Sequence, residues 1–141
     1  PLTREEVEKI LKGDYAFLLY SPHSLCREFY IECTCNMMRP RTIVDYERIP
    51  WILDAGTVRI TFDSDVRAAI GSYDIFDPGL PAVSVLEPGK LILEVKFTEM
   101  LPQLLRDVLP PSAAEFTAVS KYVLCYEKTR YMNGFEYWYE T

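Results

Sequence analysis

Hydrophobic and polar residues follow two different periods along this chain. In the first 38 residues, apolar side chains recur every three or four positions, which is typical of amphipathic helices. This period predicts one helix over residues 3–12 and a second over residues 21–37. Thr3 and Glu6 have the spacing of a capping box, in which each side chain accepts a hydrogen bond from the other residue's backbone N–H. The first helix therefore has a defined start.

In the middle of the chain the period falls to two, which is typical of β-strands. We expect strands at residues 42–53 and 57–63, joined by a short turn whose length sets the register. A two-residue turn places Arg48 opposite Asp63, whereas a three-residue loop sends Arg48 and Arg59 to opposite faces unless a bulge restores them. With the two-residue turn, one face of the pair carries Tyr46, Arg48, Arg59, Thr61 and Asp63.

The second half of the chain predicts another strand pair and two helices. Residues 83–86 and 91–97 are expected to form a hairpin around Pro88-Gly89, because Pro followed by Gly is the signature of a type II turn. Helices are expected over residues 102–109 and 112–126. Together, these elements predict an α+β fold in which helices flank an antiparallel β-sheet.

All of these elements fit one domain, because 141 residues that are 49% hydrophobic suffice for a single core. The aromatic tail contains Asn133-Gly134, a turn signal, and forms either a small hairpin or a sticky end that seeks a partner. The domain divides into a helical segment (1–38), strands (39–97), helices (98–128) and the tail (129–141).

Charge and hydropathy narrow the class of protein. The net charge is −6 and the isoelectric point is about 4.8, which argues against a nucleic-acid binder held by phosphate contacts. No apolar run approaches the roughly 18–20 residues that a membrane-spanning helix needs, and no signal segment opens the chain. We therefore expect a soluble, cytoplasmic protein without a membrane segment. Because the chain begins at Pro1, we also expect it to be a piece of something longer.

Four cysteines and one histidine are candidate metal ligands. We expect free thiols in a reducing compartment, and the alternative is a zinc site that also uses His23. The spacing leaves the role of the thiols open. They are Cys26, Cys33, Cys35 and Cys125.

Charged residues alternate with apolar ones on the predicted strands. Glu94 and Lys96 project from one face of the strand at 91–97. The guanidinium groups of Arg48 and Arg59 suit phosphate oxygens because each can engage two at once, and a carboxylate among them could hold a divalent cation. The same pattern also fits ordinary ion pairs on the solvated face of an antiparallel sheet. Periodicity alone leaves both interpretations open.

Four segments, in this order, resemble the second half of the VTC domain, the polyphosphate polymerase domain of the vacuolar transporter chaperone family: IVDYERIPW, AGTVRITFDSDVR, LILEVKF and SKYVLCYEK. They cover about residues 39–128 and are similar to the bacterial type of this domain, within the CYTH-like triphosphate tunnel superfamily. The resemblance implies a barrel of antiparallel strands whose inward-facing bases thread a phosphate chain. It covers the C-terminal half of such a domain only.

The resemblance also implies roles for individual residues. Glu94 would bind the divalent metal, Mn²⁺ or Mg²⁺. Ala118 stands where eukaryotic members carry a further base, which puts chain-end binding in doubt. Tyr46 and Ser120 would bind substrate. The cations that would neutralise phosphate oxygens during catalysis are Arg48, Arg59, Lys96 and Lys121.

The implied activity of the full-length domain is transfer of the terminal phosphoryl of ATP to a polyphosphate chain, with ATP and polyphosphate as partners. Two alternatives use the same bases: a triphosphatase, in which water is the acceptor, and a non-catalytic polyphosphate-binding or assembly module. Because half of the tunnel wall is missing, we expect this chain alone to be inactive. We also expect its exposed strand edges to pair with another copy or another chain.

Overall fold

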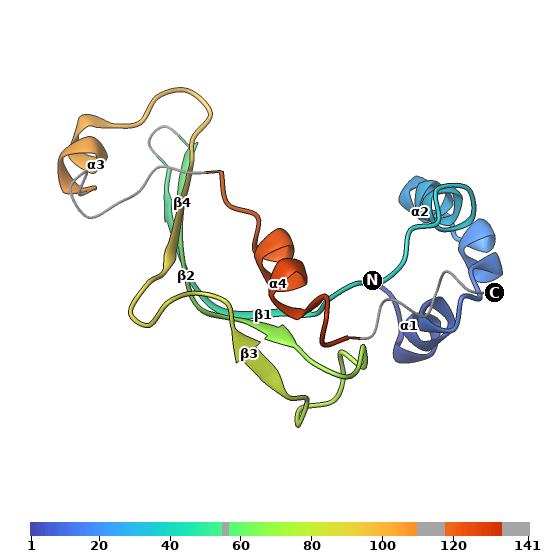
Figure 1. Cartoon of the computed structure of the whole chain (residues 1–141). Helices are drawn as coiled ribbons and strands as arrows, with labels where there is room; N and C mark the ends of the chain where they lie inside the picture. Colours follow the sequence, from blue (N-terminus) through green and yellow to red (C-terminus); the bar gives the residue numbers. More distant parts are fainter. Residues whose placement is uncertain (55–56, 110–117, 134–141) are drawn as a thin grey trace. The chain divides into compact units, whose positions relative to one another are not determined.

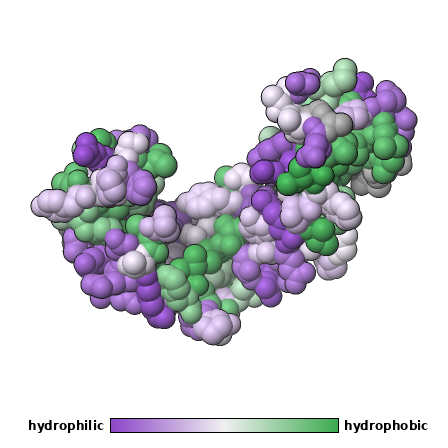
Figure 2. Space-filling model, turned by 180° about the vertical axis from the view of Figure 1, so that it is seen from behind, coloured by the Kyte–Doolittle hydropathy of each residue, from purple (hydrophilic) through white to green (hydrophobic). Residues whose placement is uncertain are grey.

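The structure is a computed structural model that describes residues 1–54, 57–109 and 118–133. It divides into two compact units (Figure 1). The first is helical and contains residues 1–41 and 73–80, and the second, which contains the sheet, takes in the rest of the chain. Apolar areas reach the surface of each unit (Figure 2). None of the helices in the described part of the chain is long and apolar enough to cross a bilayer.

Helix α1, Arg4–Leu11, begins at the predicted capping box. The hydroxyl of Thr3 accepts a hydrogen bond from the backbone N–H of Glu6 at 3.3 Å, and the Glu6 carboxylate accepts one from the backbone N–H of Thr3 at 2.7 Å. The pKa of Glu6 is lowered, chiefly by this backbone hydrogen bond. The prediction of the helix start from local spacing is confirmed.

Helix α2, Ser24–Thr34, is shorter than the helix predicted over residues 21–37. His23 is extended and forms its N-cap, and Met37 has a φ of 57°, which is incompatible with a right-handed helix. A 3₁₀ helix that the period did not predict, η1 at Ala16–Tyr20, precedes α2. The core of this unit consists of Ile10, Tyr15, Leu18 and Cys33.

Strand β2, Val58–Ala69, is the centre of the sheet, and strand β1, Val44–Leu53, pairs with one of its edges (Figure 1). They pair antiparallel, with Arg48 opposite Asp63 and Leu53 opposite Val58. This is the register of the two-residue turn, one of the two alternatives that the sequence left open. The irregularity in the pair lies between Asp45 and Glu47.

Strands β3, Ala82–Ser84, and β4, Ile92–Lys96, do not form the predicted hairpin. Both pair antiparallel with β2, and because β1 occupies one edge of β2, they follow each other along the other edge. The hairpin prediction was wrong because the twelve residues of β2 offer enough backbone for two successive partners.

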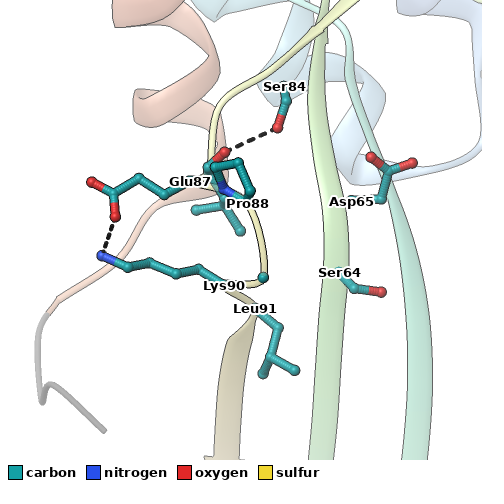
Figure 3. A pocket seen from close by; sticks show the side chains of 9 residues that line it. Ser64, Asp65, Ser84, Glu87, Pro88, Lys90 and Leu91 are labelled. Atoms are coloured by element: carbon teal, nitrogen blue, oxygen red, sulfur yellow. Dashed lines mark hydrogen bonds and ion pairs between the residues drawn. The ribbon is translucent and has the colours of Figure 1, made fainter. Parts of the chain in front are cut away.

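The turn between β3 and β4 does form as predicted. Lys90 N–H donates to the Glu87 carbonyl at 3.1 Å, and Gly89 has a φ of 80°, as a type II turn requires. The turn carries the chain past Ser64 and Asp65 of β2 and leaves a small hollow there (Figure 3). The turn therefore interrupts one edge of the sheet without reversing the chain.

Helix α3 spans Gln103–Val108, close to its predicted bounds, and helix α4 spans Lys121–Thr129. A continuous helix over 112–126 was wrong, because residues 118–120 are not helical; the first part of that predicted helix, 110–117, lies outside the described residues. Buried Cys125 packs α4 against Val66 and Ala68 of β2. The predicted tail hairpin falls mostly on residues 134–141, which also lie outside the described part.

Candidate functional site

Asp63 of β2 is the centre of a polar cluster in the second unit. Its side chain is fully buried. Arg48 of β1 donates from Nε to Oδ1 at 2.6 Å and from Nη2 to Oδ2 at 2.7 Å. The two residues lie directly opposite each other in the strand pair, so the register alone brings the guanidinium to the carboxylate. This bidentate geometry fixes the plane of the guanidinium.

Lys121 brings a second cation to the same carboxylate. Its Nζ lies 2.8 Å from Asp63 Oδ2, and its side chain is 20% exposed. Lys121 is the first residue of α4, and Ser120 caps that helix by accepting a hydrogen bond from Val123 N–H at 3.3 Å. The start of α4 therefore places Lys121 over the β1–β2 pair.

The ring of Tyr46 lies beside both cations. Its centroid is 5.0 Å from Cζ of Arg48 and 5.3 Å from Nζ of Lys121. Both distances fall within the range in which a cation is attracted to the face of an aromatic ring. Tyr46 thus helps to hold the two cations on one side of the sheet.

The electrostatic consequence is strongest at Asp63. The hydrogen bonds from Arg48 lower the pKa of this carboxyl from 3.8 to about 2; burial opposes the shift, and Lys121 adds to it. The pKa of Arg48 is raised, first by its hydrogen bonds to Asp63. Asp63 is therefore ionised across the physiological range, and Arg48 stays charged beside it.

Glu94 and Lys96 form a second ion pair on β4, with Lys96 Nζ 2.9 Å from Glu94 Oε1. The hydrogen bond from Lys96 lowers the pKa of Glu94, burial opposes it, and the charges of Lys121 and Arg48 lower it further. The influence of those two cations connects the β4 pair electrostatically to the cluster around Asp63.

Arg59 of β2 lies directly opposite Lys96 of β4. Like charges at directly opposed positions of two strands repel each other. Lys96 has Glu94 as its partner, whereas Arg59 is exposed and has no ion-pair partner among the described residues. An anion between the two strands would relieve this repulsion.

The register places these side chains on one face of the sheet. Asp63, Thr61 and Arg59 are two residues apart on β2 and therefore point the same way. Directly opposed residues also share a face, so Arg48, Glu94 and Lys96 lie on that face as well. The structure thus places Arg48 and Arg59 on one face, as expected for the two-residue turn.

The structure brings the predicted residues together in two groups. Tyr46, Arg48 and Lys121 surround Asp63, and Arg59 lies beside Glu94 and Lys96 on the β2–β4 pair. Ser120 contributes as the cap of α4. The roles in substrate and metal binding assigned to these residues remain predictions.

Sequence reasoning missed Asp63 as a site residue. Its position opposite Arg48 followed from the two-residue turn, but strand alternation does not show that its carboxylate is buried or that Lys121 reaches it from 58 positions further along the chain. One signal could have identified Asp63. It is the acidic residue that lies opposite Arg48 in the register of the two-residue turn, and the VTC motif had already assigned Arg48 to the site.

The carboxylates available for a metal ion are few. The described residues contain no group of three or more His, Cys, Asp or Glu side chains that could hold one. Both oxygens of Asp63 are engaged by cations, which leaves Glu94. Opposite Glu94, the buried hydroxyl of Thr61 has no hydrogen-bond partner in the described part of the chain. One carboxylate fits Mg²⁺ or Mn²⁺ when phosphate oxygens and water supply the other ligands.

The cysteines do not form the alternative zinc site within the described residues. All four are free, as predicted. Cys33 and Cys125 are buried, and burial is the main cause that raises the pKa of each thiol. Their contacts with Leu18 and Val66, respectively, are those of core residues.

The comparison with protein families identifies the family of this chain. The family model of the VTC domain matches residues 1–130, which include both groups of site residues. No curated protein and no solved structure gives a significant match. The resemblance carried by the strand and helix motifs is thereby confirmed over nearly the whole chain. This chain belongs to the VTC domain family.

Proposed function

We propose that this chain forms part of a polyphosphate polymerase-like domain that transfers the terminal phosphoryl of ATP to a polyphosphate chain. The observation that carries the proposal is the opposed pair of cations, Arg59 and Lys96, on the face that also holds Arg48. Lys96 is paired with Glu94, whereas Arg59 has no ion-pair partner among the described residues, and a chain of phosphates offers oxygens at a regular spacing along the strands.

The charge of this face supports the same ligand class. Among the described residues, its four cations contact two carboxylates, Asp63 and Glu94, or lie opposite a cation that does, whereas the whole chain has a net charge of −6. A local excess of positive charge in an acidic protein attracts a specific polyanion more readily than it attracts nucleic acid in general. The cations are Arg48, Arg59, Lys96 and Lys121.

Phosphoryl transfer of this kind requires no covalent bond between the protein and the transferred group. In phosphoryl transfer the attacking and leaving oxygens are in line, and catalysis comes from positioning and from stabilising charge on the transferred group. Arg48 and Arg59 would hold phosphate oxygens with planar donor groups, and Lys96 and Lys121 would add mobile point charges. Tyr46 and Ser120 would complete the substrate-binding surface.

Glu94 is the residue we propose as ligand of Mn²⁺ or Mg²⁺. When bound there, the ion would supply positive charge beside the phosphates. The ion pair between Glu94 and Lys96 would then break, and the Lys96 ammonium would donate to a phosphate oxygen instead. The unpartnered hydroxyl of Thr61 lies opposite Glu94 and could orient its carboxylate.

The sheet described here supports only part of a tunnel wall. Its four strands do not close into a barrel, and within the described residues β1 has a strand partner on one edge only. Exposed Ile49, Trp51 and Ile52 lie along β1. Further strands, from another segment or from another copy, would cover that edge, and we propose that this chain is inactive without them.

A second candidate function, binding of polyphosphate without turnover, is favoured by the scarcity of carboxylates. Of the two described carboxylates on this face, Asp63 contacts two cations and Glu94 contacts one, and a single ligand holds a metal weakly. The same tunnel with water as the acceptor would make a triphosphatase.

The test uses the protein that carries this chain, supplied with ATP and Mn²⁺ or Mg²⁺. Long polymer supports the polymerase, free phosphate supports the triphosphatase, and binding of polyphosphate without either product supports the second candidate. Arg59→Ala should abolish polymer synthesis. The matched control is Arg67→Ala, because Arg67 is on the same strand but is paired with Asp45 and Asp65. Equal activity of the two variants would overturn the assignment of this face.

A further inference from the structure

We propose that Asp63 is the positioning residue of the anion site and holds Arg48 and Lys121 so that their remaining donors meet a phosphate together. This inference rests on the proposed function. Asp63 is fully buried and contacts both cations, which come from β1 and from the start of α4. One carboxylate therefore sets the relative position of two cations that lie 73 positions apart in the sequence.

The hydrogen bonds of Arg48 leave part of its guanidinium available. Nε and Nη2 face Asp63, and Nη1 has no hydrogen-bond partner among the described residues. The ammonium of Lys121 has three donors and uses one on Asp63. The side chain of Arg48 is 38% exposed, so a ligand can reach the group while the Asp63 contacts persist.

The charge of the cluster is the second step. A buried carboxylate is balanced by one cation, and Arg48 already binds both of its oxygens. Lys121 therefore gives the cluster of Asp63, Arg48 and Lys121 a net positive charge, although the Lys121 side chain is largely removed from water. Holding such a charge costs free energy unless an anion approaches. A phosphate oxygen beside Lys121 would balance the cluster.

Fixing both cations in advance also lowers the entropic cost of binding. Free Arg and Lys side chains each lose rotamer freedom when they grip a ligand. Here Asp63 fixes the plane of the Arg48 guanidinium, and Tyr46 lies within 5.3 Å of the Lys121 ammonium. The site is therefore preorganised for a tetrahedral anion before it arrives.

The test compares Asp63→Asn with the wild type in the protein that carries this chain, using inorganic tripolyphosphate as the probe in calorimetric titrations. We expect affinity to fall at least about tenfold while circular dichroism shows a folded protein. The direction of the change in affinity is decisive, because the substitution removes a negative charge beside two cations. If charge alone mattered, affinity would rise. Unchanged or increased affinity of folded Asp63→Asn would overturn the inference.

The control is Asp45→Asn, which removes the same charge from another cross-strand pair, Asp45 with Arg67. Its affinity for tripolyphosphate should stay within about twofold of the wild type. If Asp63→Asn does not fold, Arg48→Lys replaces it, because this variant keeps the charge and loses the bidentate contact with Asp63. Wild-type affinity in Arg48→Lys would then overturn the inference.

Failure of this inference can be told from failure of the proposed function. If the wild type binds tripolyphosphate and Arg59→Ala weakens binding but Asp63→Asn does not, only the role of Asp63 is lost. If the wild type does not bind tripolyphosphate at all, both proposals are overturned.

Discussion

Acid should destabilise the sheet unit through Asp63. The pKa of this carboxyl is lowered from 3.8 to about 2 in the folded protein, first by the hydrogen bonds from Arg48. A carboxyl whose pKa is lower in the folded protein than in the unfolded chain stabilises the fold at pH values above its unfolded pKa. This stabilisation is lost as the pH falls through its folded pKa. The loss should therefore occur between about pH 4 and pH 2.

The size of the effect follows from the shift. A change from 3.8 to about 2 corresponds to roughly 2 kcal/mol of unfolding free energy. Arg48, the main partner, is 38% exposed, so solvent screens part of the interaction. We expect a loss of about 1–2 kcal/mol between pH 5 and pH 2 that is specific to Asp63.

The measurement is urea unfolding followed by circular dichroism at constant ionic strength, for the wild type and for Asp63→Asn. The difference in unfolding free energy between them should be constant above pH 5 and shrink by about 1–2 kcal/mol as the pH falls to 2. Arg48→Met should remove more of this pH dependence than Lys121→Met, because Arg48 is the larger cause. A difference that is independent of pH, or that grows in acid, would refute the reasoning.

Two further predictions concern α4 and the thiols. Ser120→Ala should destabilise the protein by about 1 kcal/mol, because the hydroxyl caps Val123 N–H, and Ser120→Asn should retain most of the stability; equal melting temperatures of all three proteins would contradict the cap. Exposed Cys35 should react with a thiol reagent well before Cys33 and Cys125, which are buried with raised pKa values, and those two should react only when denaturant is added; a Cys125 as fast as Cys35 would show that the α4 contact opens.

Local chemistry determined the features that the sequence predicted well. The capping box of α1 needs only residues three apart, and the type II turn needs Pro and Gly side by side, so neighbouring residues supply the whole free-energy preference. The short connection between β1 and β2 reduced their register to two alternatives, and the structure has the register of the two-residue turn. From that register came the shared face of Arg48 and Arg59.

Packing, and not local periodicity, decided where α4 begins. The helix predicted over residues 112–126 runs through residues 118–120, which are not helical, and its first part lies outside the described residues. In the folded chain Ser120 caps the helix that packs Cys125 on β2, and packing contributes more to a short helix than its own propensity does. The start of α4 then decided where Lys121 lies.

The sequence by itself determined the α+β class and the family motifs, because each depends on periodicity and on neighbours along the chain. It reduced the β1–β2 register to two alternatives. Tertiary structure alone decided that β3 and β4 share one edge of β2 and that Asp63 is buried between Arg48 and Lys121. Strand partners and burial depend on which distant segments compete for the same backbone and the same surface. A local sequence pattern does not show which distant segments become neighbours, and the candidate site depends on those neighbours.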